Sequence, residues 1–560
     1  MMFKKEFLEE EEKVKKEWQE LYDNLYKGKE FKATSDSGTP VKSVYTAKDL
    51  EEIDFQPEMP GIYPYTRGIY PVQYQFTPWF NNLVLGYGLP EQTRERMDLL
   101  KEMGARGYFG KDAYNLVFDL VAKAGYDPDD PEVRGRVGQA GCHFATREDF
   151  DRLFHGIDLT KVSVVHNICR ATLVQIAMYV AYLEKRGIPI KKVYGNSMNW
   201  LWAFAFVGNV AFPPKNAFKL MAEFIKFCCR NMPQWNHTNI VSYYVEESGG
   251  NAIQEAGFAI AAGIAITEEC IKAGLEPDEF LPRFGFQIAQ ASDFFEEIAK
   301  VRAMRRVWAK VNKERFGCKN PRSLHLRIHS QTSGVTLTAQ QPLNNVIRTT
   351  LETLGAVLSG TNSIQTNSYL EALSTPTEES HILALRTQQI ILHETNIPNV
   401  SDPLAGSYYV EWLTSKMEEE IFKVIEQVDK MGGFIKCWES GWFKDEITKS
   451  AYKWRERIDK GEKVIVGLNK YVTEKEQKVP VFKYPEIEDE AVKRLKEYKE
   501  KRDNEKLKTA LKRLKEVATL VDGTWPEHSG ELMPAVIETA KAEATLGELQ
   551  GVLREVFGWA

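Results

Sequence analysis

The run SLHLRIHS, residues 323–330, is one of eight short segments that alternate with longer amphipathic stretches from about residue 100 onward. The other seven are NLVFDL from residue 115, KVSVVHNI from 161, KKVYGNSM from 191, TNIVSYYV from 238, PRFGFQIA from 282, GTNSIQTN from 360 and a last one over residues 397–402. Short strands that alternate with helices predict parallel βα units, and eight such units are what a closed barrel requires. The sequence therefore predicts an α/β fold built on a (β/α)8 TIM-type barrel.

Several of the predicted strands are too polar for an ordinary barrel core. HSQTSG at 329–334, TNSIQTNS at 361–368 and YGNSMN at 194–199 carry Ser, Thr, Asn and Gln where barrel interiors are normally layered with Val, Ile and Leu. A core packed with these residues would be underfilled and would contain unmet hydrogen-bonding groups. We therefore expect a polar, slender ligand to pass through the middle of the barrel.

The rest of the chain divides around this barrel. Residues 1–45 are predicted to form an N-terminal helical arm, residues 46–410 the barrel, residues 411–474 a helical segment packed on it, and residues 475–560 a charged linker with a C-terminal helical tail. The helix in the first 30 residues carries one apolar stripe among many Glu and Lys residues, which fits either a solvated helix or an arm that clasps another subunit.

Composition and charge exclude several classes of protein. With 560 residues, of which 43% are hydrophobic, the chain is long enough for a large barrel with appended helices. A formal net charge of −6 predicts no nucleic-acid partner. The apolar stretches are too short and too interrupted to span a membrane. Seven cysteines without metal-binding spacing, and the lack of a signal peptide, indicate reduced thiols in a cytoplasmic protein.

The segment PYTRGIYPVQYQFTPW, residues 64–79, has an unusual composition. Arg67 lies among several tyrosines, Gly68 permits a turn, and three prolines hold the backbone extended. Aromatic faces beside a guanidinium suit a long ligand with a flat base and phosphates, such as coenzyme A. An irregular loop wrapped over the surface is the alternative.

This segment resembles the corresponding segment of the cobalamin-dependent acyl-CoA mutases, the methylmalonyl-CoA mutase family. Eight further strings follow in the family's order with similar spacing, namely FDLVAKAGYDPDDP, PRFGFQ, LRIHSQTSG, NNVIRT, GTNSIQTNSYLEA, RTQQIILHET, DPLAGSYYVE and VIVGLNKY, between residues 118 and 471. The resemblance implies an isomerase that rearranges the carbon skeleton of an acyl-CoA by radical chemistry, with adenosylcobalamin as cofactor. It also implies that the pantetheine arm of coenzyme A runs along the barrel axis.

The resemblance also implies roles for individual residues. On the acyl-CoA side these are Arg283 and Arg327 for the CoA phosphates, Tyr70 beside the substrate, and His329 with Gln331 as a catalytic pair that forms hydrogen bonds near the acyl group. On the cofactor side they are Phe118, Glu247, Gly334, Glu371 and Ala372. The residues alone also fit a simpler structural role: surface ion pairs for the arginines, helix caps for the two glutamates and a core position for His329.

Several positions depart from the family's pattern. The arginine that clamps the substrate carboxylate corresponds to Gly208, the tyrosine beside it to Val84, the thioester-side histidine to Tyr244, the glutamine of the same loop to Met198, and an arginine before the Pro-Trp pair to Thr77. Gly208 lies among Trp200, Trp202, Phe204 and Phe206, for which an ordinary helix core is the alternative. We therefore expect Gly208 and Met198 to line a roomier, more aromatic substrate pocket, with Tyr244 in the catalytic position, that does not accept methylmalonyl-CoA.

Arg170 follows the strand predicted from residue 161, at the edge from which barrel enzymes draw functional residues. The family carries a glycine there, so we expect Arg170, together with His166, to be a relocated polar anchor for the far end of the substrate. An outward ion pair with a neighbouring helix is the alternative.

The family's DxHxxG motif, whose histidine is the lower ligand to cobalt, is absent from the sequence. We therefore expect no cobalamin-binding Rossmann-like domain in this chain, and a separate small subunit that carries the motif and shares the cofactor in a heterotetramer. The predicted function is the large subunit of a mutase for a bulky acyl-CoA, for example an aryl-substituted dicarboxylic, arylsuccinyl-CoA-like one.

Three alternatives remain for the function. They are a mutase for a neutral branched acyl-CoA (isobutyryl- or 2-hydroxyisobutyryl-CoA-like), a catalytically silent relative that binds CoA esters, and a barrel enzyme that uses no cobalamin. The retained Glu247, Glu371 and Gly334 argue against the last two, because a silent or cobalamin-free protein has no need of a surface that faces the corrin.

Overall fold

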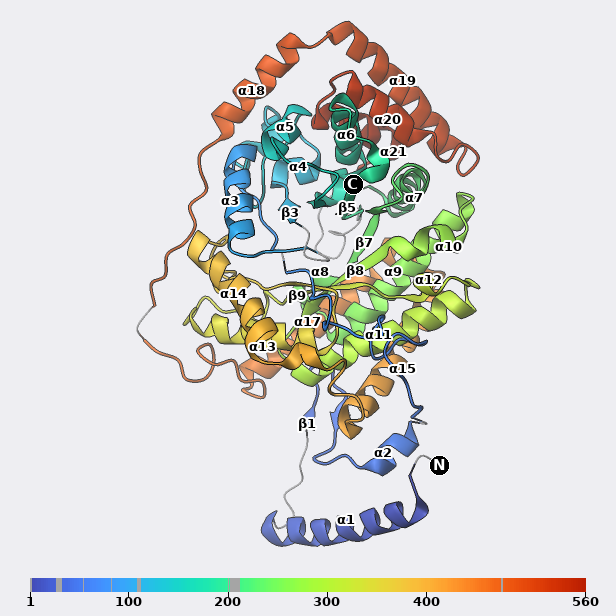
Figure 1. Cartoon of the computed structure of the whole chain (residues 1–560), viewed down its shortest axis with the longest axis vertical. Coiled ribbons are helices and arrows are strands. Elements are labelled where there is room, and N and C mark those ends of the chain that lie inside the picture. Colours follow the sequence, from blue (N-terminus) through green and yellow to red (C-terminus); the bar gives the residue numbers. More distant parts are fainter. Residues whose placement is uncertain are drawn as a thin grey trace.

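The computed structural model describes residues 3–26, 33–53, 55–81, 83–107, 112–199, 201, 212–474 and 477–559. Helices make up most of the regular structure in these residues, and the longer strands gather in the middle of the molecule (Figure 1). All pairs among these longer strands are parallel. The predicted α/β class is therefore confirmed.

The longer strands form two four-stranded sheets. The first has the order β3 (Ala113–Val117), β4 (Ser163–Asn167), β5 (Tyr194–Ser197) and β6 (Trp235–Asn236). The second has the order β10 (Ser363–Gln365), β9 (Ile328–Thr332), β8 (Phe284–Gln290) and β7 (Thr238–Val241). Near the N-terminus, β1 (Ala33–Thr34) pairs with β2 (Pro40–Val41) in an antiparallel way. Seven of the eight predicted strands are thus confirmed.

The eighth predicted strand, at residues 397–402, is wrong. Its first residues form a 3-10 turn, η7 (Ile397–Asn399), with Pro398 in the first turn, because proline fixes a helical φ and cannot donate to a strand ladder. An earlier segment lies beside β10 and β3 instead. Phe80 pairs in parallel with Ser363, and Leu85 pairs in parallel with Leu116. The hydrogen bonding is thus that of two sheets, with Phe80 bridged to β10 and Leu85 bridged to β3.

The two faces of the sheets differ in polarity. Phe286 of β8 packs edge-on against Trp308 of helix α11 (Phe294–Glu314), with ring centroids 5.0 Å apart. On the alternate positions, Gln287, His329 and Ser363 lie in register on β8, β9 and β10. Because side chains alternate across a strand, one face packs on helices and the other carries the polar residues noted in the sequence.

Helices cover the apolar faces of the sheets (Figure 1). In chain order they are α3 (Pro90–Glu102), α4 (Leu120–Ala124), α5 (Glu148–Phe154), α6 (Thr172–Lys185), α7 (Pro214–Asn231), α8 (Tyr243–Glu247), α9 (Ala252–Lys272), α10 (Pro277–Phe280), α11, α12 (Pro321–Leu324), α13 (Asn344–Leu358) and α14 (Glu378–Glu394). Helix α13 packs on β8 and β9, and α9 packs on β7.

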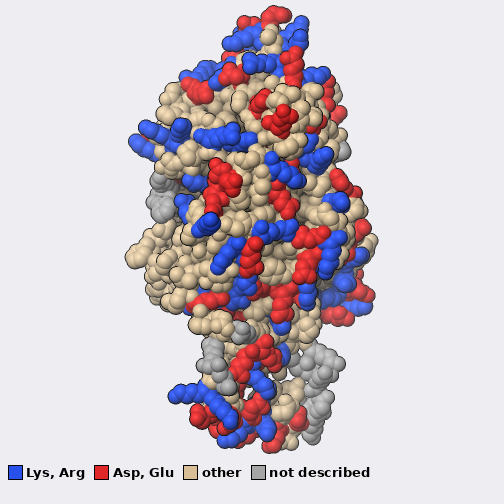
Figure 2. All heavy atoms as spheres, turned by 90° about the vertical axis from the view of Figure 1, so that its right-hand side faces the viewer, with Lys and Arg blue, Asp and Glu red and all other residues tan. Residues whose placement is uncertain are grey.

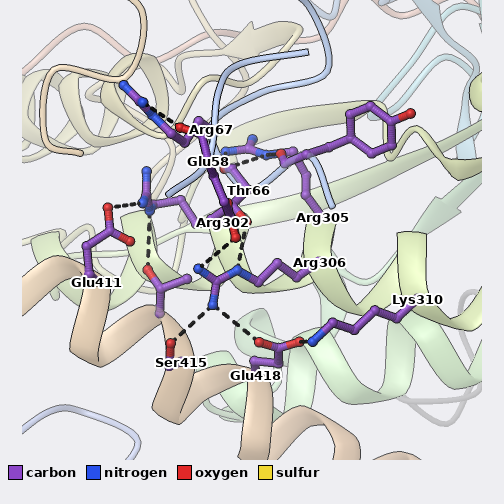
Figure 3. A network of polar contacts seen from close by, with 12 residues as sticks. Glu58, Thr66, Arg67, Arg302, Arg305, Arg306, Lys310, Glu411, Ser415 and Glu418 are labelled. Carbon is purple, nitrogen blue, oxygen red and sulfur yellow. Dashed lines mark hydrogen bonds and ion pairs between the residues drawn. The ribbon is translucent and has the colours of Figure 1, made fainter. Parts of the chain in front are cut away.

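Arginines of α11 fasten the 64–79 segment to the body of the protein (Figure 3). Arg305 donates to the backbone carbonyl of Thr66 at 2.8 Å, and Arg306 donates to its hydroxyl at 2.7 Å. Arg302 pairs at 2.7 Å with Glu411 of helix α15 (Tyr408–Lys430). Buried guanidinium groups that are hydrogen-bonded in this way hold their partners firmly, so the segment has a defined conformation.

The two ends of the chain extend from opposite sides of the sheets (Figure 1). Helix α1 (Lys5–Tyr26) stands apart from the sheets and contacts α2 (Ala47–Glu52), where Lys48 pairs with Glu12 at 3.1 Å. The C-terminal helices are α16 (Phe434–Glu439), α17 (Trp442–Asp459), α18 (Glu488–Lys501), α19 (Asn504–Gly523), α20 (Leu532–Lys541) and α21 (Leu546–Phe557). Helices α20 and α21 pack on α6. The boundaries proposed between the arm, barrel, segment and tail remain predictions.

The surface mixes both signs of charge. On the face drawn in Figure 2, Lys and Arg side chains alternate with Asp and Glu side chains, and neither sign dominates. Within the described ranges, no helix has the length and apolar character needed to cross a lipid bilayer.

Candidate active site

A cavity of about 340 Å³ opens at the C-terminal ends of three parallel strands. Val117 is the last residue of β3, Gln365 is the last residue of β10, and Gln331 is the last but one of β9; all three line the cavity. The remaining wall comes from residues 84–87, from α3 and from the region where α14 begins. Functional residues of barrel enzymes gather at this edge, so the cavity is the candidate active site.

A chain of amide hydrogen bonds fixes Gln331 in the cavity wall. The Nε2 atom of Gln287 donates to Oε1 of Gln331 at 2.8 Å, and Nε2 of Gln331 donates to Oδ1 of Asn367 at 3.1 Å. Asn367 in turn donates to the carbonyl of Thr332 at 2.7 Å. Because each amide is held by the next, the Gln331 side chain presents one orientation to a bound group.

His329 lies two residues before Gln331 on the same face of β9, so the structure brings the predicted pair together. Its Nδ1 atom is 2.8 Å from Oγ of Ser363 on the neighbouring strand. Burial lowers the pKa of His329 to about 4. The imidazole is therefore neutral near pH 7 and acts as a hydrogen-bonding group rather than as a cation.

Glu247 and Gly334 lie together beyond the end of β9. Oε1 of Glu247 accepts hydrogen bonds from Oγ of Ser333 and from the backbone N–H of Gly334, both at 2.7 Å. A Cβ atom on Gly334 would stand 2.9 Å from Oε2 of Glu247 and 3.3 Å from the hydroxyl of Tyr243. Glycine is thus needed here because Glu247 and Tyr243 approach its backbone closely, and the adjacent Val335 is 51% exposed. This exposed backbone beside Glu247 is where the predicted cofactor contact would lie.

Glu371 also lines the cavity, and Ala372 follows it at the surface. Surrounding protein atoms, and secondly the carboxylate of Glu247, raise the pKa of Glu371 to about 7. Solvent still reaches Glu371, which screens part of this effect. Phe118 differs from the other predicted cofactor contacts, because it is fully buried with its ring centroid 5.6 Å from that of Phe144. Its contact with a cofactor stays a prediction.

The predicted CoA-phosphate residues lie at the opposite end of the strands. Arg283 immediately precedes β8, and Arg327 immediately precedes β9, where its Nη1 atom is 3.4 Å from Oδ1 of Asn236. Burial lowers the pKa of Arg283, and the positive charge of the nearby Arg322 lowers it further. Several positive charges therefore lie at this end of the strands. Four residues of extended strand, on the order of 13 Å, separate Arg327 from Gln331. The arginines and the cavity thus mark the two ends of one path along the polar face.

The predicted aromatic and anchor residues are divided between two places. Tyr70 is 49% exposed and lies near the arginines, with its ring centroid 6.5 Å from that of His325. Arg170, in η3 (Cys169–Ala171), lies over the ring of Trp559 near the C-terminus, with its Cζ atom 5.9 Å from the ring centroid. The positive charge of Arg170 also acts on Tyr244 of α8. Arg170 and Tyr244 do not line the 340 Å³ cavity among the residues that the structure describes.

Met198 is buried just beyond β5, where its carbonyl accepts a hydrogen bond of 2.6 Å from Oγ1 of Thr172. This bond ties the loop to the start of α6. Gly208, together with the aromatic residues Trp200, Trp202, Phe204 and Phe206, lies outside the described residues. The roles predicted for these residues stay predictions.

A buried arginine and a buried histidine are among the cavity residues that were not predicted from the sequence. Arg96 of α3 and His381 of α14 both line the wall and are 7% and 3% exposed. A signal for Arg96 does exist in the sequence. It shares the buried face of α3 with Thr93, Met97 and Leu100, so a charged residue occupies the apolar stripe of an amphipathic helix.

Comparison with known proteins agrees with this geometry. The family model described as methylmalonyl-CoA mutase matches residues 34–559. The 2-hydroxyisobutanoyl-CoA mutase large subunit of Aquincola tertiaricarbonis is 38% identical over 523 residues, which cover 93% of this chain and 91% of that protein. The mitochondrial methylmalonyl-CoA mutase of Homo sapiens is 36% identical over 564 residues, which cover 100% of this chain and 73% of that protein. The methylmalonyl-CoA mutase of Rhizobium meliloti is 35% identical over 559 residues, which cover 98% and 76%.

Proposed function

The chain belongs to the methylmalonyl-CoA mutase family of cobalamin-dependent isomerases, and we propose that it is the substrate-binding large subunit of an adenosylcobalamin-dependent acyl-CoA mutase. The observation that carries this proposal is the polar path along β8 and β9. Arg283 and Arg327 at one end suit the phosphates of coenzyme A, and the cavity at the other end suits the acyl group.

The sheets are proposed to close into the predicted (β/α)8 barrel, with residues 80–85 in place of the strand expected at 397–402. The parallel bridges of Phe80 and Leu85 to strands of different sheets support this closure on one side. On the other side a single residue, His237, separates β6 from β7. The polar face would then line the barrel axis, where the pantetheine arm can satisfy amide groups such as Gln287, whose Oε1 atom lacks a hydrogen-bond partner in the described structure.

Residues of this chain are assigned to hold the cofactor and to orient the substrate. Gly334, Glu247, Glu371 and Ala372 would face the corrin or the adenosyl group, and the bound cofactor would supply the radical that starts the rearrangement. Neutral His329 and the fixed amide of Gln331 would hold the thioester end of the substrate by hydrogen bonds. The enclosing walls would exclude water from the reacting atoms.

A separate small subunit is proposed as the partner, in a heterotetramer of two large and two small chains. The support is the printed name of the Aquincola relative, a large subunit that this chain matches over 91% of its length. The histidine that binds cobalt is proposed to come from this small subunit. A cytoplasmic location is supported by seven free cysteine thiols.

The acyl group is proposed to be bulky, because Val84 and Val117 in the cavity wall leave room where a larger side chain would fill it. A neutral branched acyl-CoA is the second candidate. It is favoured by the 38% identity to a protein named for 2-hydroxyisobutanoyl-CoA.

The proposal is tested by binding measurements on the chain together with the small cobalamin-binding subunit of the same organism. We expect the pair to bind adenosylcobalamin tightly and the large chain alone to bind it poorly. Mass spectrometry should find an acyl-CoA retained through purification, and Arg283→Ala should weaken that retention. Tight cofactor binding by the large chain alone, or no affinity of the pair for any acyl-CoA, would refute the assignment.

A further inference from the structure

We propose that Arg96 binds a free carboxylate on the acyl group, so that the enzyme takes a dicarboxylic acyl-CoA whose far end lies against α3. This inference rests on the proposed function, because it assumes that the acyl group occupies the cavity lined by Gln331 and Glu371. It assigns the substrate class and a specificity-determining residue.

Arg96 is a buried cation without a protein counter-ion. Only 7% of the residue is exposed, and its side chain forms part of the cavity wall. Within the described residues the structure records neither an ion pair nor a hydrogen bond from its guanidinium, whose recorded contact is the ring of Tyr87, 5.3 Å from Cζ. A guanidinium that lies over a ring keeps its N–H donors at its edges, where a ligand in the cavity can reach them.

Other arginines in the described part of the chain have ion-pair or hydrogen-bond partners. Arg302, at 1% exposure, pairs with Glu411 and Asp402, and Arg305, at 3%, donates to backbone carbonyls. On α3 itself, Arg94 pairs with Asp98 at 2.8 Å and donates to the carbonyl of His155 at 2.7 Å. Arg96 is the exception, and its guanidinium faces the cavity, where the carboxylate of a ligand can supply the missing anion.

His381 supplies a second polar group on the same wall. It is 3% exposed, and its ring nitrogens form no hydrogen bond of good geometry within the described chain, while the backbone of Val84 lies close enough to act on the ring. Burial, and secondly the charge of Arg96, lower the pKa of His381 to about 3, so the ring is neutral and carries one N–H. A carboxylate accepts several hydrogen bonds, and Arg96 with His381 offers donors from two helices, α3 and α14.

No neighbouring acid competes for Arg96. Glu371 is the carboxylate among the residues that line the cavity, and it forms no ion pair with Arg96 in the described structure. Glu371 is exposed, so solvent screens its charge from Arg96. The guanidinium of Arg96 is therefore available to an anion in the cavity.

This placement differs from that of Arg170, which lies over Trp559 at the end of β4. Both arginines are candidates for the charge that the family's pattern places at Gly208, and one experiment separates them. If Arg96 is the anchor, changes at Arg170 leave the carboxylate preference unchanged.

The test uses the full chain with its small subunit and two pairs of CoA thioesters. Glutaryl-CoA is compared with pentanoyl-CoA, and benzylsuccinyl-CoA with its analogue that carries methyl in place of the free carboxylate. Binding is measured by calorimetry, so that no turnover is needed. In the pair whose acyl group fits the cavity, we expect the wild type to bind the thioester with a free carboxylate about 10- to 150-fold more tightly than the neutral thioester. This is the range for a hydrogen bond to a charged group.

Four variants test which residue causes that preference. Arg96→Met should abolish it while leaving the affinity for the neutral thioester within about twofold, and Arg96→Lys should keep part of it, because an ammonium attracts a carboxylate without bidentate geometry. Arg94→Met, two residues away on the outer face of α3, is the matched control and should retain the full preference. Arg170→Lys should retain it as well.

The outcomes distinguish this inference from the proposed function. If both thioesters of each pair bind equally well to the wild type, or if Arg96→Met keeps the preference, the role of Arg96 is refuted while the mutase assignment stands. If no CoA thioester binds to the wild type, the proposed function fails together with the inference. Should Arg96→Met not fold, the Arg96→Lys variant still decides, since an unchanged preference there contradicts a bidentate clamp.

Discussion

Gln287 of β8 donates a hydrogen bond of 2.8 Å to Gln331 of β9, and this bond joins the polar face of the sheet to the candidate active site. Gln287 lies in register with His329, so one strand pair supports both members of the predicted catalytic pair. The barrel path and the cavity are therefore parts of one hydrogen-bonded structure rather than separate features.

Gln331→Leu should lower kcat/KM by roughly 10²-fold, the magnitude seen when a preorganised hydrogen-bond donor is removed from an active site. It should also leave Nε2 of Gln287 and Oδ1 of Asn367 without their hydrogen-bond partner, which costs about 1–3 kcal/mol of stability. Steady-state kinetics and chemical unfolding measure the two effects. Gln340→Leu, at an exposed position, is the control. Full activity in Gln331→Leu would remove this residue from the site.

Gly334→Ala should weaken adenosylcobalamin binding by at least about tenfold while acyl-CoA affinity stays the same. The added Cβ would stand 2.9 Å from Oε2 of Glu247 and would displace this predicted cofactor-facing carboxylate. Cofactor titration of the subunit pair, followed by absorbance, provides the measurement. Gly551→Ala is the matched control, because a Cβ there has nothing within 4 Å. Equal cofactor affinity in both variants would mean that Gly334 does not face the cofactor.

His329→Gln should reduce the sensitivity of the protein to mild acid. The folded-state pKa of about 4 lies below the unfolded value near 6.5, so His329 has no effect on stability above pH 6.5. As the pH falls from 6.5 towards 4, the unfolded chain takes up the proton first, and the wild type loses about 2 kcal/mol by pH 5. Urea unfolding at pH 7 and pH 5 measures the change. A stability difference between wild type and variant that does not depend on pH would contradict a neutral, buried His329.

Arg96→Met should raise the midpoint of thermal unfolding of the ligand-free protein by roughly 1–4 °C, because a buried charge without a partner is replaced by an apolar side chain of similar length. Differential scanning calorimetry gives the midpoint. Arg94→Met should lower it or leave it unchanged, since Arg94 is paired with Asp98. A clear loss of stability in Arg96→Met would show that the guanidinium has a structural partner.

The seven confirmed strands were predicted from short runs of apolar or small residues that alternate with longer amphipathic stretches. The prediction failed at residues 397–402, where Pro398 turns the chain into η7 and the Phe80 segment pairs with β10 instead. That pairing joins residues more than 280 positions apart, and no local pattern encodes it. Most of the predicted site residues lie at strand ends or next to them. Once a strand is predicted correctly, the location of these residues at one edge of the sheet follows.

Arg96 was missed for a different reason. It lies on a helix, where a charge is usually solvated, and only the packing of α3 against the cavity shows that this one is buried. Arg170 was expected at a strand end and does follow β4, but the sequence could not reveal that the C-terminal residue Trp559 packs beside it. Contacts between distant elements decide such cases.

The central claim is that this chain, with a cobalamin-binding small subunit, rearranges the carbon skeleton of an acyl-CoA. The most direct test is ¹³C nuclear magnetic resonance of the assembled pair with adenosylcobalamin and a panel of acyl-CoA thioesters labelled at the carbon that carries the thioester group. We predict that the label of a bulky dicarboxylic thioester moves to the neighbouring carbon, that omission of the cofactor or of either chain stops the reaction, and that methylmalonyl-CoA reacts poorly. Unchanged labels across the whole panel, or rearrangement by this chain without cobalamin, would contradict the account.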